Sequence, residues 1–238
     1  MSLLSAVCLH QITVIPARMM IGVWLLTALG LWSTAGVSWA SEMLCHLMMV
    51  KLSLAALLGV VLLLLVGGFY LMKSLHRLNT SAVALFYLIF ITLAGMMLGH
   101  CFTSQGVAVV LGIAGGMFAV SACICWLIDR NPGSVGQVIL MSFYGIIITA
   151  AVNGALDSSP SRWFYSLSSV VVWAVAAGCE NETLRGYACK MYTAEFYTQP
   201  RCIVLGAVTL YLSVIAFFRR LILALLDFIP YICRSVPR

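Results

Sequence analysis

The chain has 238 residues, of which 63% are hydrophobic and only 8% are charged, and its mean hydropathy is +1.09. Soluble domains carry about 25% charged residues, so this chain has too few charges to cover a globular surface. The composition excludes a soluble enzyme, a disordered protein and a small disulfide-rich secreted domain. It predicts a polytopic helical membrane protein, since each transmembrane helix needs about 20 apolar residues and the chain has room for about seven or eight such helices.

The net charge of +6 does not indicate nucleic-acid binding, because Lys and Arg stand singly or in pairs between apolar runs and form no basic stripe. The nine cysteines include no CxxC pair, which gives no sign of a zinc site or a disulfide framework. The sequence has no HExxH motif and no phosphate-binding glycine loop. We therefore expect no enzymatic activity, no resident cofactor or metal, no nucleic-acid partner, and contact with the lipid bilayer.

Seven hydrophobic runs, separated by charged residues or by Gly and Pro, are predicted to span the membrane. We expect an all-α seven-transmembrane-helix bundle over residues 19–229, with a short N-terminal arm over residues 1–18 and a C-terminal tail over residues 230–238. The expected spans are 19–40, 52–72, 81–99, 107–128, 135–156, 163–178 and 202–218, the last with an extension.

The distribution of Lys and Arg predicts a cytoplasmic N-terminus. With seven spans, the N-terminal arm and the second, fourth and sixth loops carry seven of these residues, whereas the opposite loops carry only Lys51 and Arg162. The tail disagrees, because Arg219, Arg220 and two further arginines would then lie on the far side. A last segment that enters the membrane and returns would remove this conflict, so both positions of the C-terminus stay open.

The first span has a second interpretation as a signal peptide. Ser38 and Ala40 are small residues at the spacing that a signal peptidase requires. However, the apolar run is longer than the core of a usual signal peptide, and the arm before it lacks a basic cluster. These two features favour a retained span.

Ionisable side chains within the hydrocarbon cost about 2.5–3.5 kcal/mol on insertion scales, so each is a functional candidate. Glu180 and Glu182 form an acidic pair at the end of the sixth expected span. Calcium takes six to eight oxygen ligands, more than this pair supplies, and the simpler interpretation is the solvated start of a loop. Arg219 is either an interfacial anchor or a fixed charge that guards an internal cavity.

Four glycines are predicted to lie at helix–helix contacts. Gly95 and Gly99 form a GxxxG motif in the third expected span, and Gly112 and Gly115 lie in the fourth. Small residues let helix backbones approach closely in lipid. We therefore expect a tightly packed bundle around these positions.

Three segments, in the right order, resemble the Bax-inhibitor (transmembrane Bax-inhibitor-motif) family. The sequence FITLAGMMLG from Phe90 resembles the third helix of that family, and ILMS from Ile139 resembles its fifth. The sequence AVTLYLSVIAFFR from Ala207 resembles the last helix, where the family has Leu-Tyr-Leu-Asp. The resemblance covers roughly residues 81–226. It implies a seven-helix bundle with the last helix at its centre, a location in internal membranes such as endoplasmic reticulum or Golgi, a calcium leak, and the restraint of cell death.

The sequence departs from this family at the two aspartates on which the leak depends. Cys179 and Glu180 stand near the place of the first aspartate, and Ser213 replaces the second. Two neighbouring carboxylates make a proton-sensitive latch because each disfavours ionisation of the other. One glutamate and one hydroxyl cannot form such a latch. Glu180, Glu182, Ser213 and Arg219 are nevertheless the candidate positions of an ion path or gate.

The short N-terminal arm and the long sixth loop make the chain similar to the Bax-inhibitor-like multispanning proteins of cytomegaloviruses. This resemblance implies a viral modulator that binds host membrane proteins and alters cell death, immune recognition or membrane traffic. The absence of the two aspartates on which the family's leak depends favours this hypothesis. The alternative is a Bax-inhibitor-like calcium leak that lowers stored calcium and restrains apoptosis, and a third interpretation is a structural membrane protein without transport. The sequence leaves the oligomeric state open.

Overall fold

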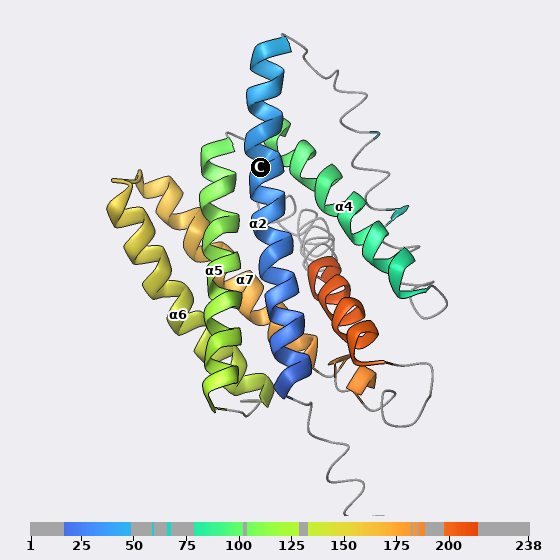
Figure 1. Ribbon diagram of the computed structural model, residues 1–238. Helices are drawn as coiled ribbons and strands as arrows, with labels where there is room; N and C mark the ends of the chain where they lie inside the picture. Colours follow the sequence, from blue (N-terminus) through green and yellow to red (C-terminus); the bar gives the residue numbers. More distant parts are fainter. Residues whose placement is uncertain are drawn as a thin grey trace, which may run out of the picture.

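The computed structural model describes residues 17–48, 59, 66–67, 79–101, 104–128, 133–181, 183–184, 186–188 and 198–213, and all regular structure within these residues is helical. The helices are α2 (Ala17–Met48), α4 (Thr80–Cys101), α5 (Ser104–Ile128), α6 (Gly133–Ala155) and α7 (Pro160–Cys179), followed by a helix over residues 199–213. Figure 1 shows them gathered into one bundle with α2 running along it.

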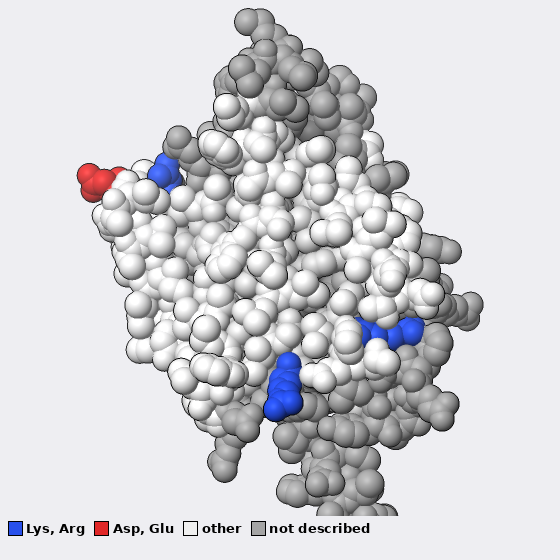
Figure 2. Space-filling view, viewed as in Figure 1, with Lys and Arg blue, Asp and Glu red and all other residues white. Residues whose placement is uncertain are grey.

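Four of these helices are long and apolar enough to cross a membrane. The qualifying stretches are Arg18–Ser41, Thr80–Gly99, Gly106–Ile128 and Gly133–Ala155. Large apolar side chains such as Leu85, Trp126 and Phe143 are exposed on them, as lipid-facing surfaces require. Figure 2 shows the charged side chains of the described residues near the ends of the bundle, with an uncharged surface between them. The chain is an integral, multi-pass helical membrane protein.

The count of seven spans is not established by the described residues. The expected span 52–72 lies outside them apart from three positions, and the expected span 202–218 is described only up to Ser213. α7 overlaps the expected span 163–178 but is not among the four membrane-crossing candidates. The expected tail over residues 230–238 also lies outside the described part of the chain.

α2 lies against α4 through small residues. A Cβ atom added to Gly95 would come within 2.8 Å of both the Thr34 carbonyl oxygen and the Val37 Cβ, and one added to Gly99 would overlap the Ser38 carbonyl. Because a backbone carbonyl of α2 lies in the way at each of the two glycines, a larger residue could enter only if the helices separated. The GxxxG motif thus sets the distance between these two helices.

α2 contacts α5 through Trp32. The Trp32 Nε1–H donates to the Gly112 carbonyl oxygen at 3.3 Å. A Cβ atom on Gly115 would overlap the same indole, whereas one on Gly112 would meet nothing within 4 Å. The absence of a side chain at Gly115 therefore makes room for the indole, while Gly112 contributes its carbonyl.

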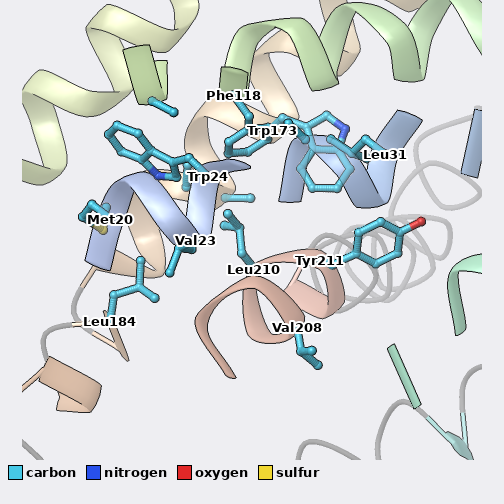
Figure 3. Packing of buried hydrophobic residues seen from close by; sticks show 14 of the residues in the cluster. Met20, Val23, Trp24, Leu31, Phe118, Trp173, Leu184, Val208, Leu210 and Tyr211 are labelled. Carbon is cyan, nitrogen blue, oxygen red and sulfur yellow. The ribbon is translucent and has the colours of Figure 1, made fainter. Parts of the chain in front are cut away.

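Aromatic and aliphatic side chains from all of the described helices form the buried core. Figure 3 shows Trp24 and Leu31 of α2, Phe118 of α5, Trp173 of α7 and Tyr211 of the helix 199–213 within this cluster. The Phe118 and Trp173 rings meet edge to face with centroids 5.7 Å apart, a favoured aromatic geometry. The last described helix therefore packs in the interior of the bundle.

The connection after α7 differs from the expected polar loop. The sequence indicates a solvated segment over residues 180–201, but Leu184, Tyr187 and Ala188 are buried and Arg201 lies in the first turns of the helix 199–213 with only 3% of its surface exposed. Apolar residues among the charges of this segment explain the difference, since Leu184 packs against Gly206 of the helix 199–213.

Candidate functional site

The helix 199–213 is enclosed by other elements along its length. After Arg201 its sequence carries no charge, and every residue from Leu205 to Ser213 is buried. A helix that is apolar on all sides belongs in the interior of a bundle. Gly206 faces Val23 of α2, because a Cβ atom there would come within 2.7 Å of a methyl group on that side chain. This helix positions the polar groups described next.

Tyr211 joins the last described helix to α2. Its hydroxyl lies 2.6 Å from the Thr34 Oγ1, and the Thr34 hydroxyl donates its own proton to the Gly30 carbonyl oxygen at 2.8 Å. Since Thr34 has one hydroxyl proton, the Tyr211 O–H is the donor in the bond between them. Around this bond the Tyr211 ring packs against Tyr87 and Trp173, with centroids at 5.7 and 6.1 Å.

Two further hydroxyls on the same helix are satisfied locally. The Thr209 Oγ1 donates to the Leu205 carbonyl oxygen at 2.8 Å and accepts a hydrogen bond from the Tyr187 hydroxyl at 3.0 Å. The Ser213 Oγ donates to the Leu210 carbonyl oxygen at 2.8 Å. Ser213 therefore contributes a neutral group, bonded within its own helix, where the family resemblance implies a carboxylate.

The structure does not bring the predicted site residues together. Glu180 is half-buried at the C-terminal cap of α7, where its backbone N–H bonds the Ala176 carbonyl oxygen. Tyr211 contacts Trp173 of α7, and Ser213 lies two residues beyond Tyr211. Glu180 lies seven residues beyond Trp173, which is about 10 Å along the axis of α7. Glu180 and Ser213 thus lie at different depths. Glu182 and Arg219, the other two candidates, are outside the described residues.

Among the described residues, no group of three His, Cys, Asp or Glu side chains comes close enough to hold a metal ion. Calcium prefers six to eight oxygen ligands, with carboxylates prominent among them. The polar groups described in the interior are instead hydroxyls and amides, together with the Trp24 indole N–H and the Arg201 guanidinium. Hydroxyls and amides suit passage or weak binding of a hydrated ion better than tight chelation.

A row of buried residues on α6 is a second polar feature, which the sequence analysis missed. Gln137, Met141, Gly145, Thr149 and Asn153 are spaced by four and are all buried. The side-chain amides of Gln137 and Asn153 and the hydroxyl of Thr149 have no hydrogen-bond partner in the described structure. Their spacing by multiples of four can be seen in the sequence, but only ionisable residues in the spans are treated as functional candidates, and these residues are neutral.

Comparison with known proteins gives consistent results. The profile of the family described as inhibitor of apoptosis-promoting Bax1 matches residues 17–228. The chain is 30% identical over 202 residues to the uncharacterized protein YbhM of Escherichia coli, with 85% of each chain covered. It is 23% identical over 197 residues to the inner membrane protein YbhL of the same species, covering 81% of this chain and 84% of the relative. No solved structure matches the chain significantly.

These relatives are bacterial, and they give no support to the resemblance with cytomegalovirus proteins. An uncharacterized protein of Borreliella burgdorferi is 22% identical over 148 residues, which is 61% of this chain and 63% of that relative. The match to the family profile covers most of the chain, including the helices that carry both polar features. The chain therefore belongs to the Bax1-I family of Bax-inhibitor-like membrane proteins.

Proposed function

We propose that the protein is a passive leak for small cations, calcium included, across the membrane in which it lies. Family membership supports a leak over a purely structural role. The observation that carries the proposal is the set of fully buried polar side chains on α6, Gln137, Thr149 and Asn153, which have no hydrogen-bond partner in the described structure. Polar groups within the membrane are costly, and they mark ion and substrate pathways in many membrane proteins.

The proposed leak differs from that of the family in its response to pH. A pair of interacting carboxylates would change its charge over the mildly acidic range, but Ser213 bears no titratable proton in that range and Glu180 lies at a different depth. The leak is therefore expected to have nearly the same rate at neutral and mildly acidic pH.

Calcium efflux from proteoliposomes tests the proposal. Vesicles holding the purified full-length protein are loaded with calcium and followed with an external indicator dye, beside protein-free vesicles of the same lipid. Efflux above that of the protein-free vesicles at both pH values is the expected result. No efflux at either pH would overturn the proposal.

A modulator that acts by binding other membrane proteins is the competing candidate. The observation in its favour is the neutral hydroxyl of Ser213 at the position of a family aspartate, since a chain that has lost the carboxylate pair can also have lost transport. The bacterial relatives point to partners other than host proteins of a virus. The flux experiment separates the two candidates, because a modulator of this kind requires no ion movement.

We further propose that the end of the bundle holding Arg18 and Arg201 faces the cytoplasm. Both arginines lie at the starts of helices that run in the same direction, whereas Arg162 lies at the opposite end with Asp157. Positively charged residues favour the cytoplasmic side. A periplasmic-active reporter enzyme fused after residue 158 should be active in a bacterial host. An inactive fusion at that site, with an active one after residue 17, would reverse the orientation.

A further inference from the structure

The unpartnered polar row of α6 lies between two other helices. A Cβ atom on Gly145 would overlap the Val170 side chain of α7 and come within 3.1 Å of the Met117 sulfur of α5. Three residues after Gly145 on α6, the Ile148 Cδ1 would lie 3.6 Å from a Cβ atom on Gly116 of α5. The face of α6 that contains Gly145 therefore points into the seam where α5, α6 and α7 meet (Figure 1).

The contacts fix an antiparallel register between α6 and α7. Gly145 is level with Val170, and Gly178 is level with Val138, since a Cβ atom on Gly178 would overlap that side chain. By the same register Thr149 is level with Ser166 of α7, which is also fully buried. Hydroxyl groups of both helices thus lie at one depth in the seam.

The row extends through most of the membrane. Gln137 and Asn153 are 16 residues apart, about 24 Å along a helix, against about 30 Å for the hydrocarbon core. Gln137 lies at one end of the row, and Thr149 and Asn153 lie toward the other. Between them the seam is apolar: Gly145 lies against Met117 and Val170, and the buried Met141 lies one turn away on α6. The seam consists of two polar stretches and an apolar constriction.

The missing partners of these polar groups call for an explanation. Fully buried amides and hydroxyls in proteins almost always have a hydrogen-bond partner, which is often an ordered water. Both polar atoms of the Gln137 amide, both of the Asn153 amide and the Thr149 Oγ1 lack one in the described structure. Leucine or valine at these three positions would fill a similar volume without leaving polar atoms unsatisfied. Water or a hydrated ion in the seam would satisfy all of them.

An acidic residue lies beyond each end of the row. Asp157 follows the C-terminal end of α6 by two residues and is exposed, and Glu180 follows Gly178, which packs at the N-terminal end of α6. Carboxylates at the two mouths of a pathway raise the local concentration of cations. The neutral oxygens of the row would then replace part of the hydration shell during passage.

We infer that the α5–α6–α7 seam is the route of the cation leak, with Gln137, Thr149 and Asn153 as its hydrated lining and Met117, Met141 and Val170 as its apolar gate. This inference rests on the proposed leak and specifies its path. The occupant is a small hydrated cation, held by neutral oxygens. An apolar constriction of this kind limits flux by dewetting, which keeps such a leak slow.

Isosteric substitutions in the lining test the route. Thr149→Val, Asn153→Leu and Gln137→Leu are each compared with wild type in the calcium-efflux assay. The matched control is Thr92→Val, because Thr92 is an exposed residue of α4 whose hydroxyl only bonds the Leu88 carbonyl oxygen of its own helix. Each lining variant should lower the efflux rate by about tenfold, the factor that one hydrogen bond to the permeating species is worth, while the control leaves it unchanged.

Substitution of the gate should act in the opposite direction. Val170→Ala removes two methyl groups beside Gly145 and should raise the efflux rate severalfold. Val171→Ala makes the same chemical change on the lipid-exposed side of α7 and is the control. Because Val170→Ala increases the flux, a loss of folded protein cannot mimic the expected result.

The outcomes separate the route from the leak itself. Lower flux in the lining variants together with higher flux in Val170→Ala supports the route. Wild-type efflux that none of these substitutions alters would overturn the route and leave the leak in place. No wild-type efflux would overturn the leak and its route together. A charged, water-soluble thiol reagent should also modify the cysteine of the Thr149→Cys variant, and mass spectrometry locates the modified residue. Protection of that cysteine in vesicles that conduct calcium would overturn the route.

Discussion

Tyr211→Phe isolates the hydrogen bond that joins the helix 199–213 to α2. The substitution deletes the hydroxyl that donates to the Thr34 Oγ1 at 2.6 Å but keeps the ring contacts with Tyr87, Phe90 and Trp173. Thr34 keeps its bond to the Gly30 carbonyl oxygen, so no donor is orphaned. Interhelical hydrogen bonds in membranes average about 0.6 kcal/mol and reach about 1.7 kcal/mol, and we expect a loss of unfolding free energy within that range.

Two comparison variants set the scale. Tyr211→Ala removes the ring as well and should cost about 3–5 kcal/mol, as other aromatic truncations in cores do. Thr34→Val leaves the Tyr211 hydroxyl buried without its acceptor, a loss of about 1–3 kcal/mol. The double variant Thr34→Val/Tyr211→Phe has no orphaned group, so it should be less destabilised than the sum of the two single variants.

Unfolding in mixed micelles with increasing sodium dodecyl sulfate, followed by tryptophan fluorescence, measures these free energies. Tyr165→Phe is the control, because Tyr165 is exposed on α7 and its loss of a hydroxyl should change little. Our account of the site would be refuted if Tyr211→Phe were as destabilising as Tyr211→Ala. Strict additivity of Thr34→Val and Tyr211→Phe would refute the pairing of the two hydroxyls.

Three further predictions concern packing and flux. Gly99→Val should lower the unfolding free energy by about 1–3 kcal/mol, because the new side chain overpacks the contact with α2. Gly36→Val is the control, since a side chain at that position meets open space. Equal changes in melting temperature for the two variants would contradict the prediction. Glu180→Gln/Glu182→Gln should slow calcium efflux, and unchanged efflux would exclude the acidic mouth. Ser213→Asp should lower the unfolding free energy, because it places an ionisable carboxyl group at a buried position of the helix 199–213; a wild-type melting temperature would contradict this.

The class of fold was predictable because it depends on composition. Apolar runs of about 20 residues with so few charges can only be membrane helices, and α4, α5 and α6 cover the runs that begin at Ser81, Val107 and Val135. The GxxxG motif predicted close packing at Gly95 and Gly99 but not the helix against which they pack, which in the structure is α2.

The interior partners were not predictable, because they depend on long-range contacts. Thr34 and Tyr211 are 177 residues apart, and nothing near either residue indicates the other. Arg201 was assigned to a loop because it ends a polar stretch and directly follows Gln199 and Pro200, yet it lies in the helix 199–213 and is buried. The row on α6 escaped notice for a different reason, since Gln137, Thr149 and Asn153 are neutral and interrupt an apolar run only singly.

The two polar regions of the bundle differ in how well their groups are satisfied. On the helix 199–213, the hydroxyls of Thr209 and Ser213 bond backbone carbonyls within the helix, so that region is stable without water. On α6, Asn153 and Thr149 leave buried polar atoms unpartnered, at about 1–3 kcal/mol for each such group. A fold retains that much instability where the group has another use. The leak that we propose therefore relies on the polar groups of α6, and the last described helix serves mainly to hold the bundle together.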